Sequence, residues 1–444
     1  MYRPLVLELP KIKNDLDLSD LSDKKVLLST SINYPLFSYG FHSYLHRTKS
    51  AMSITENLET KDKFYYIVSP FEHKTLNYKE DMEFLTKKFF KEENEPEILS
   101  RAFYKMWEML YLFDLVGKDS TVATLAEGPG AFIQAIIKYK EYFGLEGKDK
   151  IFGVTIHSEN KNHIEMGKQF LSYYEGKKPD LINIHKTYPL KTAMKYKSRD
   201  NGDITQVKTI SNFKKDVVKE KKQVDLVTAD GGFEWKDENY QEQEAYQLVL
   251  GQIVGALRVQ GKGGNFVLKL FESFTEVTIK MILILMHFYD NCYLYKPRFS
   301  RTSNSERYII CKGFKYDQVK DKKYLDNVIT NLEEALEMMT SELFVNDIFT
   351  NLKIPDELKN KIKYYNITLA NEQQIMINKI VLFIKGNNYY GEDYHNYLNQ
   401  QIKAINWWVD NFFDKTKQLE NRKQLENELE YHESEFKNFI KLLD

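Results

Sequence analysis

The sequence predicts an α/β protein built on a doubly wound, mostly parallel sheet of seven strands. Between residues 96 and 316, short apolar runs alternate with longer amphipathic stretches. This is the pattern of strands covered by helices on both faces. A glycine-rich turn at 126–132 follows the first of these runs. The last two runs follow one another without an intervening helix, which indicates one antiparallel strand.

The elements of this region follow a regular order. After a leading amphipathic helix at 101–110, strands are predicted at 121–126, 151–156, 181–185, 224–229, 265–270, 292–296 and 307–312. Helices are predicted at 130–139, 160–174, 240–257 and 275–289. The C-terminal region is predicted to be helical throughout, at 324–344, 356–384, 394–413 and 417–443. We therefore expect an N-terminal extension (1–95), a central α/β domain (96–316) and a helical C-terminal region (317–444).

Composition gives no indication of a nucleic-acid or membrane partner. The 444 residues include 63 Lys and Arg against 64 Asp and Glu, so any surface that binds RNA must be a local patch. No apolar run is long enough to cross a membrane. The two cysteines, Cys292 and Cys311, lie in separate apolar stretches, which predicts no disulfide and a reducing, intracellular compartment. The cytoplasm is favoured over the nucleus.

The turn at 126–132 has the features of a ligand-binding turn. Its glycines let the backbone approach a ligand closely, and the helix that follows offers free N–H groups. In α/β sheets, ligands bind at the carboxyl ends of strands. A tight turn without a ligand is the alternative. The candidate cofactor-binding residues of this turn are Glu127, Gly128, Pro129, Gly130, Ala131 and Phe132.

Three charged residues lie at or near predicted strands, and a fourth lies on the leading helix. Asp230 ends an apolar strand and precedes two glycines, and Glu306 lies where a loop becomes a strand. Lys269 lies inside an apolar strand, where lysine is rarely buried unless it is paired. Lys105 lies on the leading helix. Each alone has an ordinary explanation: a capping Asp, an edge-strand Lys, a surface Glu and a solvated helix Lys.

The order of these features is more specific than any one of them. A lysine on a leading helix, a glycine-rich turn, and then Asp, Lys and Glu at successive strands resembles the FtsJ/RrmJ-like RNA ribose 2′-O-methyltransferases. Within that family, three segments are most similar to the mRNA cap-1 enzymes, including those of large cytoplasmic DNA viruses. They are 202–205 (Gly-Asp-Ile-Thr), 229–233 (Ala-Asp-Gly-Gly-Phe) and 304–308 (Asn-Ser-Glu-Arg-Tyr), the last preceded by a Lys-Pro pair. The likeness covers about residues 96–316.

The resemblance implies a fold, a cofactor and a substrate. The fold is a Rossmann-like methyltransferase sheet, the cofactor is S-adenosylmethionine, and the substrate is RNA, with capped mRNA favoured. The implied catalytic tetrad is Lys105, Asp230, Lys269 and Glu306. Asp203 and Asp230 join the turn as cofactor-binding residues, and the residues implied to contact RNA are Arg298, Arg301 and Asn304.

The chain departs from the family pattern at two places. Ala131 replaces the second glycine that usually follows the proline, and alanine is well tolerated where a helix begins. The acidic residue that binds the cofactor ribose after the second strand has only Glu159 as a candidate.

Methyl transfer to a ribose hydroxyl needs in-line geometry and loss of the hydroxyl proton. The candidate base is Lys269. Burial beside Lys105 favours a neutral lysine, whereas Asp230 and Glu306 favour the charged form, so the sequence leaves the charge state open. No step of this scheme uses a metal, and we predict none.

Basic and aromatic residues alternate in segment 185–199, as suits single-stranded RNA, with a solvated basic loop as the alternative. A second basic run, at 214–222, has the character of a solvated face. The C-terminal helices are a candidate docking region for a capping or transcription partner. Two other functions remain open: methylation of rRNA or tRNA ribose, and a non-catalytic RNA-binding scaffold.

Overall fold

The computed structural model describes most of the chain. The described residues are 3–12, 18, 21, 25–32, 39–55, 65–72, 85–86, 88–90, 95–157, 165–196, 198–219, 223–232, 236–339, 342–386 and 391–443. Glu159 and Phe233, which the family resemblance singled out, lie outside these residues, as do Lys197, Lys221 and Lys222 of the basic segments.

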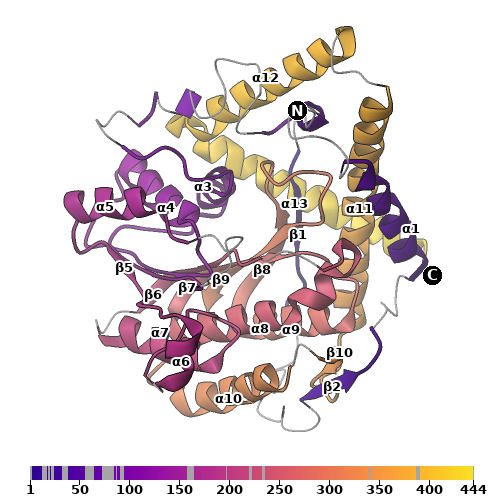
Figure 1. Cartoon of the computed structure of the whole chain (residues 1–444). Helices are drawn as coiled ribbons and strands as arrows, with labels where there is room; N and C mark the ends of the chain where they lie inside the picture. Colours follow the sequence, from indigo (N-terminus) through magenta and orange to yellow (C-terminus); the bar gives the residue numbers. More distant parts are fainter. Residues whose placement is uncertain are drawn as a thin grey trace.

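A sheet with the strand order β1-β8-β9-β7-β6-β3-β4-β5 forms the centre of the molecule (Figure 1). Its strands are β1 (Leu5–Glu8), β3 (Thr121–Leu125), β4 (Lys150–Val154), β5 (Ile182–Ile184), β6 (Val224–Ala229), β7 (Gln260–Leu270), β8 (Tyr289–Lys296) and β9 (Arg307–Phe314). The strands from β3 to β7 pair in parallel, and β9 is antiparallel to both of its neighbours. The predicted doubly wound α/β fold is therefore confirmed.

The sheet has one strand more than the seven predicted. Strand β1 belongs to the N-terminal extension and pairs antiparallel with β8, with Leu5 opposite Lys296. Its four residues make too short an apolar run to be recognised as a member of a sheet whose other strands begin more than a hundred residues later. The N-terminal extension thus contributes directly to the central sheet.

Helices cover both faces of the sheet. The described α-helices are α1 (Tyr39–Ser50), α3 (Ala102–Phe113), α4 (Ala131–Phe143), α5 (Lys168–Lys177), α6 (Leu190–Lys195), α7 (Val207–Lys219), α8 (Gln241–Val259), α9 (Glu276–Phe288), α10 (Lys322–Met338), α11 (Asp356–Lys385), α12 (Glu392–Phe412) and α13 (Gln418–Lys441). Helices α3 and α4 lie on one face, and α8 and α9 on the other (Figure 1). Helices α6 and α7 were not predicted.

Alternation along the strands explains why both faces are covered. Ala123 and Leu125 of β3 pack into the core that α8 and α9 share, whereas Val122 packs into the core with α3 and α4. Successive side chains of a strand point to opposite faces, so a strand that is apolar throughout needs a layer on each side. This layering leaves the carboxyl ends of β3, β6 and β7 at one edge.

The prediction that the C-terminal region is helical throughout is wrong, because this region also contains a strand. Strand β10 (Phe344–Ile348) pairs antiparallel with β2 (Val26–Ser29) to form a small second sheet. A five-residue strand acquires its hydrogen bonds from a partner some three hundred residues away, which no local pattern reveals. Helices α12 and α13 pack against α3, and α13 also packs against β1. The flanks are thus joined to the central domain, and the predicted boundaries at 95 and 316 remain predictions.

None of the described helices has the length and apolar character that a membrane crossing requires.

Candidate active site

The glycine-rich turn lies between the end of β3 and the start of α4. Gly130 precedes α4 with a φ of +107°, and a Cβ there would lie 2.8 Å from the Met166 sulfur. A side chain at this position would be strained by the backbone and crowded by its neighbour, so glycine is required. The turn borders a pocket of about 1010 Å³, at the upper end of the usual range for ligand sites.

The pocket is lined by residues from several strand ends. From the predicted set they are Glu127, Gly128, Pro129, Ala131, Phe132, Asp203, Asp230 and Lys269. Gly130 does not line the pocket, but its backbone conformation allows the turn to form. The structure therefore brings the predicted cofactor residues together around one cavity.

Glu127 is the buried acid of this turn. Its Oε1 accepts hydrogen bonds from the N–H groups of Phe132, at 2.8 Å, and Ile133, at 3.4 Å, and so caps the start of α4. Burial, and after it the charge of Asp230, raises the pKa of Glu127 to about 8. Among the described residues, its Oε2 has no hydrogen-bond partner although it is buried. An unpaired buried carboxyl oxygen beside a pocket fits a ligand with polar N–H or O–H groups.

A second turn closes the far side of the pocket. Gly202 has a φ of +78°, and a Cβ there would lie 2.1 Å from the backbone oxygen of Thr155 at the end of β4. Asp203 Oδ1 accepts from the N–H of Thr205 at 3.0 Å and from its hydroxyl at 2.7 Å. Because Gly202 allows this close approach, Asp203 reaches the pocket rim where the resemblance had placed it.

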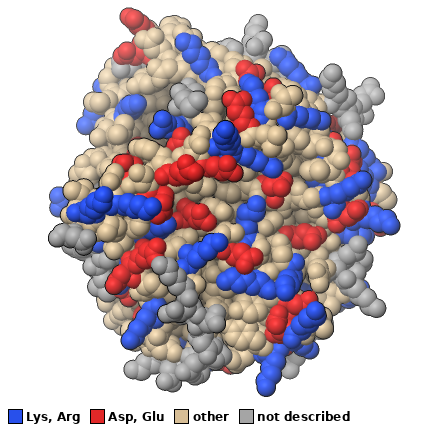
Figure 2. Space-filling view, turned by 180° about the vertical axis from the view of Figure 1, so that it is seen from behind, with Lys and Arg blue, Asp and Glu red and all other residues tan. Residues whose placement is uncertain are grey.

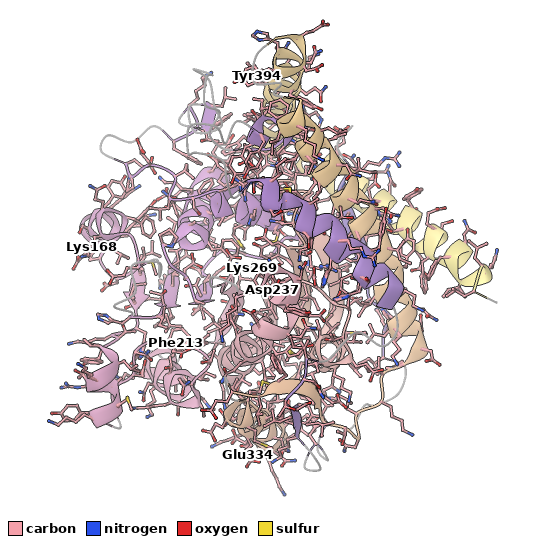
Figure 3. All side chains as sticks on the ribbon, turned by 45° about the vertical axis from the view of Figure 1, so that its right-hand side comes forward. Lys168, Phe213, Asp237, Lys269, Glu334 and Tyr394 are labelled. Carbon is pink, nitrogen blue, oxygen red and sulfur yellow. The ribbon has the colours of Figure 1, made fainter. Side chains whose placement is uncertain are left out.

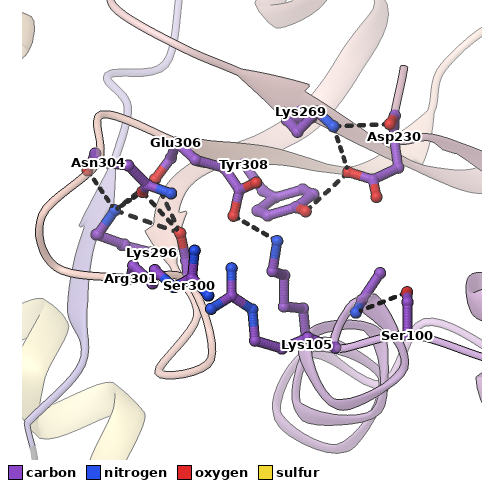
Figure 4. A network of polar contacts seen from close by, with 12 residues as sticks. Ser100, Lys105, Asp230, Lys269, Lys296, Ser300, Arg301, Asn304, Glu306 and Tyr308 are labelled. Atoms are coloured by element: carbon purple, nitrogen blue, oxygen red, sulfur yellow. Dashed lines mark hydrogen bonds and ion pairs between the residues drawn. The ribbon is translucent and has the colours of Figure 1, made fainter. Parts of the chain in front are cut away.

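The four tetrad candidates form two adjoining ion pairs (Figure 4). Lys105 Nζ donates to Glu306 Oε1 at 2.6 Å. Lys269 Nζ donates to the backbone oxygen of Asp230 at 2.7 Å and lies 3.1 Å from its Oδ1. Lys269 is near the centre of the molecule (Figure 3), and it is 9% exposed against 6% for Lys105. A helix, two parallel strands and one loop therefore bring these charges together.

Strand register explains the second pair. Leu268 of β7 lies opposite Ala229 of β6, so Lys269 and Asp230 are the next residues of two adjacent parallel strands. Tyr308 of β9 lies opposite Lys269 on the other side, and its hydroxyl donates to Asp230 Oδ1 at 2.8 Å. The sequence motif contained Tyr308, but only the antiparallel register shows that it holds the Asp230 carboxylate in place.

Glu306 remains ionised in this setting. Burial opposes its charge, but the ammonium groups of Lys105 and Lys269 outweigh burial and hold the pKa of Glu306 well below its usual range. The site therefore contains an ionised carboxylate beside two lysines.

Lys296 is a further buried lysine that supports the loop carrying Glu306. Its Nζ donates to the backbone oxygens of Asn304, at 2.9 Å, and Glu306, at 2.7 Å, and to Asn304 Oδ1 at 3.1 Å. Burial lowers the pKa of Lys296 to about 7. The sequence showed that Lys296 precedes a proline, but the local pattern did not reveal a role for the lysine. Its hydrogen-bond acceptors, Asn304 and Glu306, belong to the loop that follows.

Replacing Lys296 with methionine is expected to lower kcat for methyl transfer roughly 10- to 100-fold, because a misplacement of about 1 Å at a reacting group can cost 10²-fold. Cofactor affinity should stay unchanged, since Lys296 does not line the pocket. Calorimetric titration with S-adenosylmethionine, beside steady-state kinetics, separates the two quantities. Lys353→Met, at an exposed lysine, is the control. Parallel losses of kcat and cofactor affinity would contradict this positioning role.

The residues expected to contact RNA lie in different settings. Asn304 faces Lys296 and stabilises the loop. The guanidinium of Arg301 pairs with Glu72, at 2.6 Å, and lies 4.0 Å from the ring centroid of Tyr66. Its side chain is 30% exposed, so it can still meet a ligand.

Arg298 is not brought to the pocket. Its guanidinium lies 3.2 Å from Glu108 Oε1 and over the ring of Trp407, and the side chain is 6% exposed. Glu108 is fully buried and needs a positive partner, which Arg298 supplies. Arg298 therefore neutralises a core carboxylate and lies away from the pocket, where the sequence had predicted contact with RNA.

The prediction of no metal took no account of His42 and His46, four residues apart on α1. With Glu272 they form a group whose ligand atoms lie within 4.8 Å of one another. However, Glu272 Oε1 already accepts from Lys49 Nζ and from the Ser305 hydroxyl, both at 3.0 Å. A carboxylate paired with an ammonium is a poor metal ligand. The cluster is better described as an ion-pair network that joins α1 to the loop of Glu306.

A glycine-lined pocket at the carboxyl ends of a doubly wound sheet, beside paired lysines and carboxylates, defines a Rossmann-like group-transfer site of the methyltransferase class. Residues 98–314 match the sequence model of the FtsJ-like methyltransferase family. This part of the chain is an FtsJ-like methyltransferase domain, and such methyltransferases use S-adenosylmethionine.

The chain is also similar to curated relatives. It is 28% identical to the cap-specific mRNA (nucleoside-2′-O-)-methyltransferase 1A of Caenorhabditis briggsae, over 65% of this chain and 31% of the relative. It is 27% identical to the inactive cap-specific mRNA (nucleoside-2′-O-)-methyltransferase 1B of the same species, over 65% of this chain and 32% of the relative. It is 31% identical to the cap-specific mRNA (nucleoside-2′-O-)-methyltransferase 1 of Mus musculus, over 53% of this chain and 28% of the relative. The matched part thus spans about a third of the length of these relatives.

Proposed function

We propose that this chain catalyses S-adenosylmethionine-dependent 2′-O-methylation of RNA ribose, at the first transcribed nucleotide of capped mRNA. The observation that carries the proposal is the pair of lysine–carboxylate contacts, Lys105–Glu306 and Lys269–Asp230, beside the glycine-lined pocket. The names of the relatives support capped mRNA as the substrate.

The unpaired Glu127 Oε2 and the close-approach glycine at 202 make the pocket suitable for S-adenosylmethionine. When bound, this cofactor supplies an electrophilic methyl group on a positively charged sulfur. The turn at 126–132 and Asp203 would hold it from opposite sides of the pocket. The Asp230 and Glu306 carboxylates favour positive charge nearby, which stabilises the bound sulfonium.

Lys269 is the proposed base. Its Nζ is fixed by two oxygens of Asp230, so the remaining direction of the amine can face a ribose hydroxyl in the pocket. In its neutral form Lys269 would take the 2′-hydroxyl proton while the methyl group passes from the sulfonium sulfur, which would become a neutral thioether, to the ribose oxygen. The ammonium that results is stabilised by the carboxylate 3.1 Å away. Lys105 orients Glu306 and adds positive charge beside the phosphate-bearing substrate.

The scaffold alternative stays open because one relative is named as inactive. All four tetrad positions are filled in this chain and are in contact in pairs, which supports an enzyme. A cytoplasmic location and a capping or transcription partner on the C-terminal helices remain predictions.

The cap proposal predicts a strong preference between two RNA substrates that differ only at the 5′ end. With labelled S-adenosylmethionine, transfer to capped RNA should exceed transfer to the 5′-triphosphate form at least about tenfold, equivalent to about 1.4 kcal/mol of differential binding. Nuclease digestion of the product should place the label on the first nucleotide. Equal transfer to both RNAs would indicate another RNA target, and cofactor binding without any transfer would indicate a scaffold.

A further inference from the structure

Helix α6 and the loops around it form a surface where cations and aromatic rings alternate. The Arg199 guanidinium lies 4.8 Å from the ring centroid of Tyr188 and 4.7 Å from that of Tyr196. Lys186 Nζ lies 5.6 Å from the Tyr188 ring, and Lys195 Nζ lies 5.5 Å from the Tyr196 ring. We call these five residues, with Lys191, the basic platform.

The basic platform is fixed to the methyltransferase domain by hydrogen bonds. Lys208 Nζ of α7 donates to the backbone oxygens of Ala193, at 2.6 Å, and Tyr196, at 2.9 Å. The N–H of Tyr188 donates to the backbone oxygen of Asp200 at 2.9 Å. Asp200 Oδ1 in turn accepts from the N–H of Gly202 at 2.9 Å. The same backbone therefore connects the platform to the turn that carries Asp203 at the pocket rim.

The charge of this segment differs from that of the rest of the molecule. Residues 186–199 contain five Lys or Arg and no Asp or Glu, although the whole chain has a net charge of −1. On the face shown in Figure 2, by contrast, basic and acidic side chains are interspersed. Local positive charge on a nearly neutral protein indicates an anionic partner.

The platform also exposes apolar surface. Tyr196 is 43% exposed, Leu190 58% and Met194 79%. Exposed ring faces beside cations suit a flexible anion whose flat groups can stack, because phosphates pair with the cations and bases with the rings.

We propose that the basic platform binds the single-stranded RNA that extends beyond the nucleotide in the active site. This inference rests on the proposed function, since it concerns the same substrate. Arg199 lies only three residues before Gly202, which lines the pocket, so the platform continues from the pocket rim. RNA long enough to cover both would gain affinity from the platform, whereas a few nucleotides would not reach it.

The test compares a triple variant, Lys186→Ala, Lys191→Ala and Lys195→Ala, with the unchanged protein. Affinity for a fluorescent capped RNA of about 20 nucleotides is measured by anisotropy across a salt series. This length exceeds the roughly 4–16 nucleotides that one compact fold covers on a single strand. Removing three phosphate contacts should reduce the slope of log K against log salt by about 2, at about 0.7 per contact for a single strand. Methylation of a capped RNA of about four nucleotides, the lower end of that range, should be unchanged.

Two further variants make the result specific. Lys379→Ala, Lys385→Ala and Lys403→Ala together remove the same charge from exposed positions of α11 and α12, and should leave the slope as it was. Tyr196→Ala should weaken binding of the long RNA about fivefold or more without changing the slope, because stacking is insensitive to salt.

The outcomes separate the platform from the catalytic site. If the triple variant binds long RNA like the unchanged protein while the short RNA is still methylated, the platform proposal is overturned and the proposed function stands. If neither RNA is methylated by any form, but the triple variant still loses the salt slope, the platform is supported and the enzymatic proposal fails. If a polyglutamate peptide binds as tightly as the long RNA, and the triple variant loses affinity for both equally, the platform is a protein-docking surface instead.

Discussion

Replacing Lys269 with methionine is expected to lower kcat for methyl transfer by about 10³-fold, within the 10²- to 10⁴-fold range of general acid–base catalysis. Methionine matches the lysine chain as far as the ε carbon and lacks the amine that lies 2.7 and 3.1 Å from two oxygens of Asp230. The proton of the ribose hydroxyl then has no acceptor at that position. Single-turnover kinetics with capped RNA measures the chemical step directly.

Cofactor binding provides the internal comparison for this variant. The turn at 126–132 and Asp203 remain intact in Lys269→Met, so the affinity for S-adenosylmethionine should change only a few-fold. Lys262→Met, at an exposed position of the same strand, controls for the loss of a lysine and should have normal turnover. Near-normal turnover of Lys269→Met would exclude it as the base, and the proton would have to leave by another route.

The second large effect is expected on stability. Replacing Glu108 with alanine should lower the free energy of unfolding by about 3–5 kcal/mol, the usual cost of breaking a buried ion pair. Glu108 Oε1 accepts from the N–H of Arg298, at 3.1 Å, and from the Tyr295 hydroxyl, and Oε2 accepts from Trp408 Nε1 at 2.7 Å. Without Glu108, the Arg298 guanidinium loses its carboxylate partner in a place where the side chain is only 6% exposed.

Urea unfolding followed by tryptophan fluorescence measures this change. Glu426→Ala, at an exposed position of α13, should alter the free energy of unfolding by less than about 0.5 kcal/mol. A small effect of Glu108→Ala would mean that Arg298 finds another partner or reaches solvent. In that case Arg298 would again become a candidate for contact with RNA.

Much of the central domain follows from local pattern. Strand β6 has the bounds predicted for it, and the glycine-rich turn, Asp230 and Lys269 all lie at strand ends on one edge of the sheet. Runs of apolar residues with turn residues between them reveal strands that are buried on both faces, and parallel strands bring their carboxyl ends together. The family resemblance placed Lys105 and Glu306 in the same site, although nothing in their local sequence does so.

The partners of the charged residues could not be predicted in this way. Lys105 and Glu306 are 201 positions apart, and their contact depends on how α3 packs over the loop before β9. Arg298 lies in the same loop, but its side chain turns toward Glu108 in the core. Two charges in one loop thus have opposite roles, and only the packing of distant helices distinguishes them.

The sequence by itself determined the order of strands in the central domain, the helices other than α6 and α7, the glycine-rich turn and the identity of the acid and base candidates. The tertiary structure decided that β1 completes the sheet, that β10 pairs with β2, and that Tyr308 and Lys296 contact the candidate residues Asp230 and Glu306. The physical reason is that periodicity and turn chemistry are local properties of the chain. Burial and pairing of a charge are decided by whichever distant segment fills the space beside it.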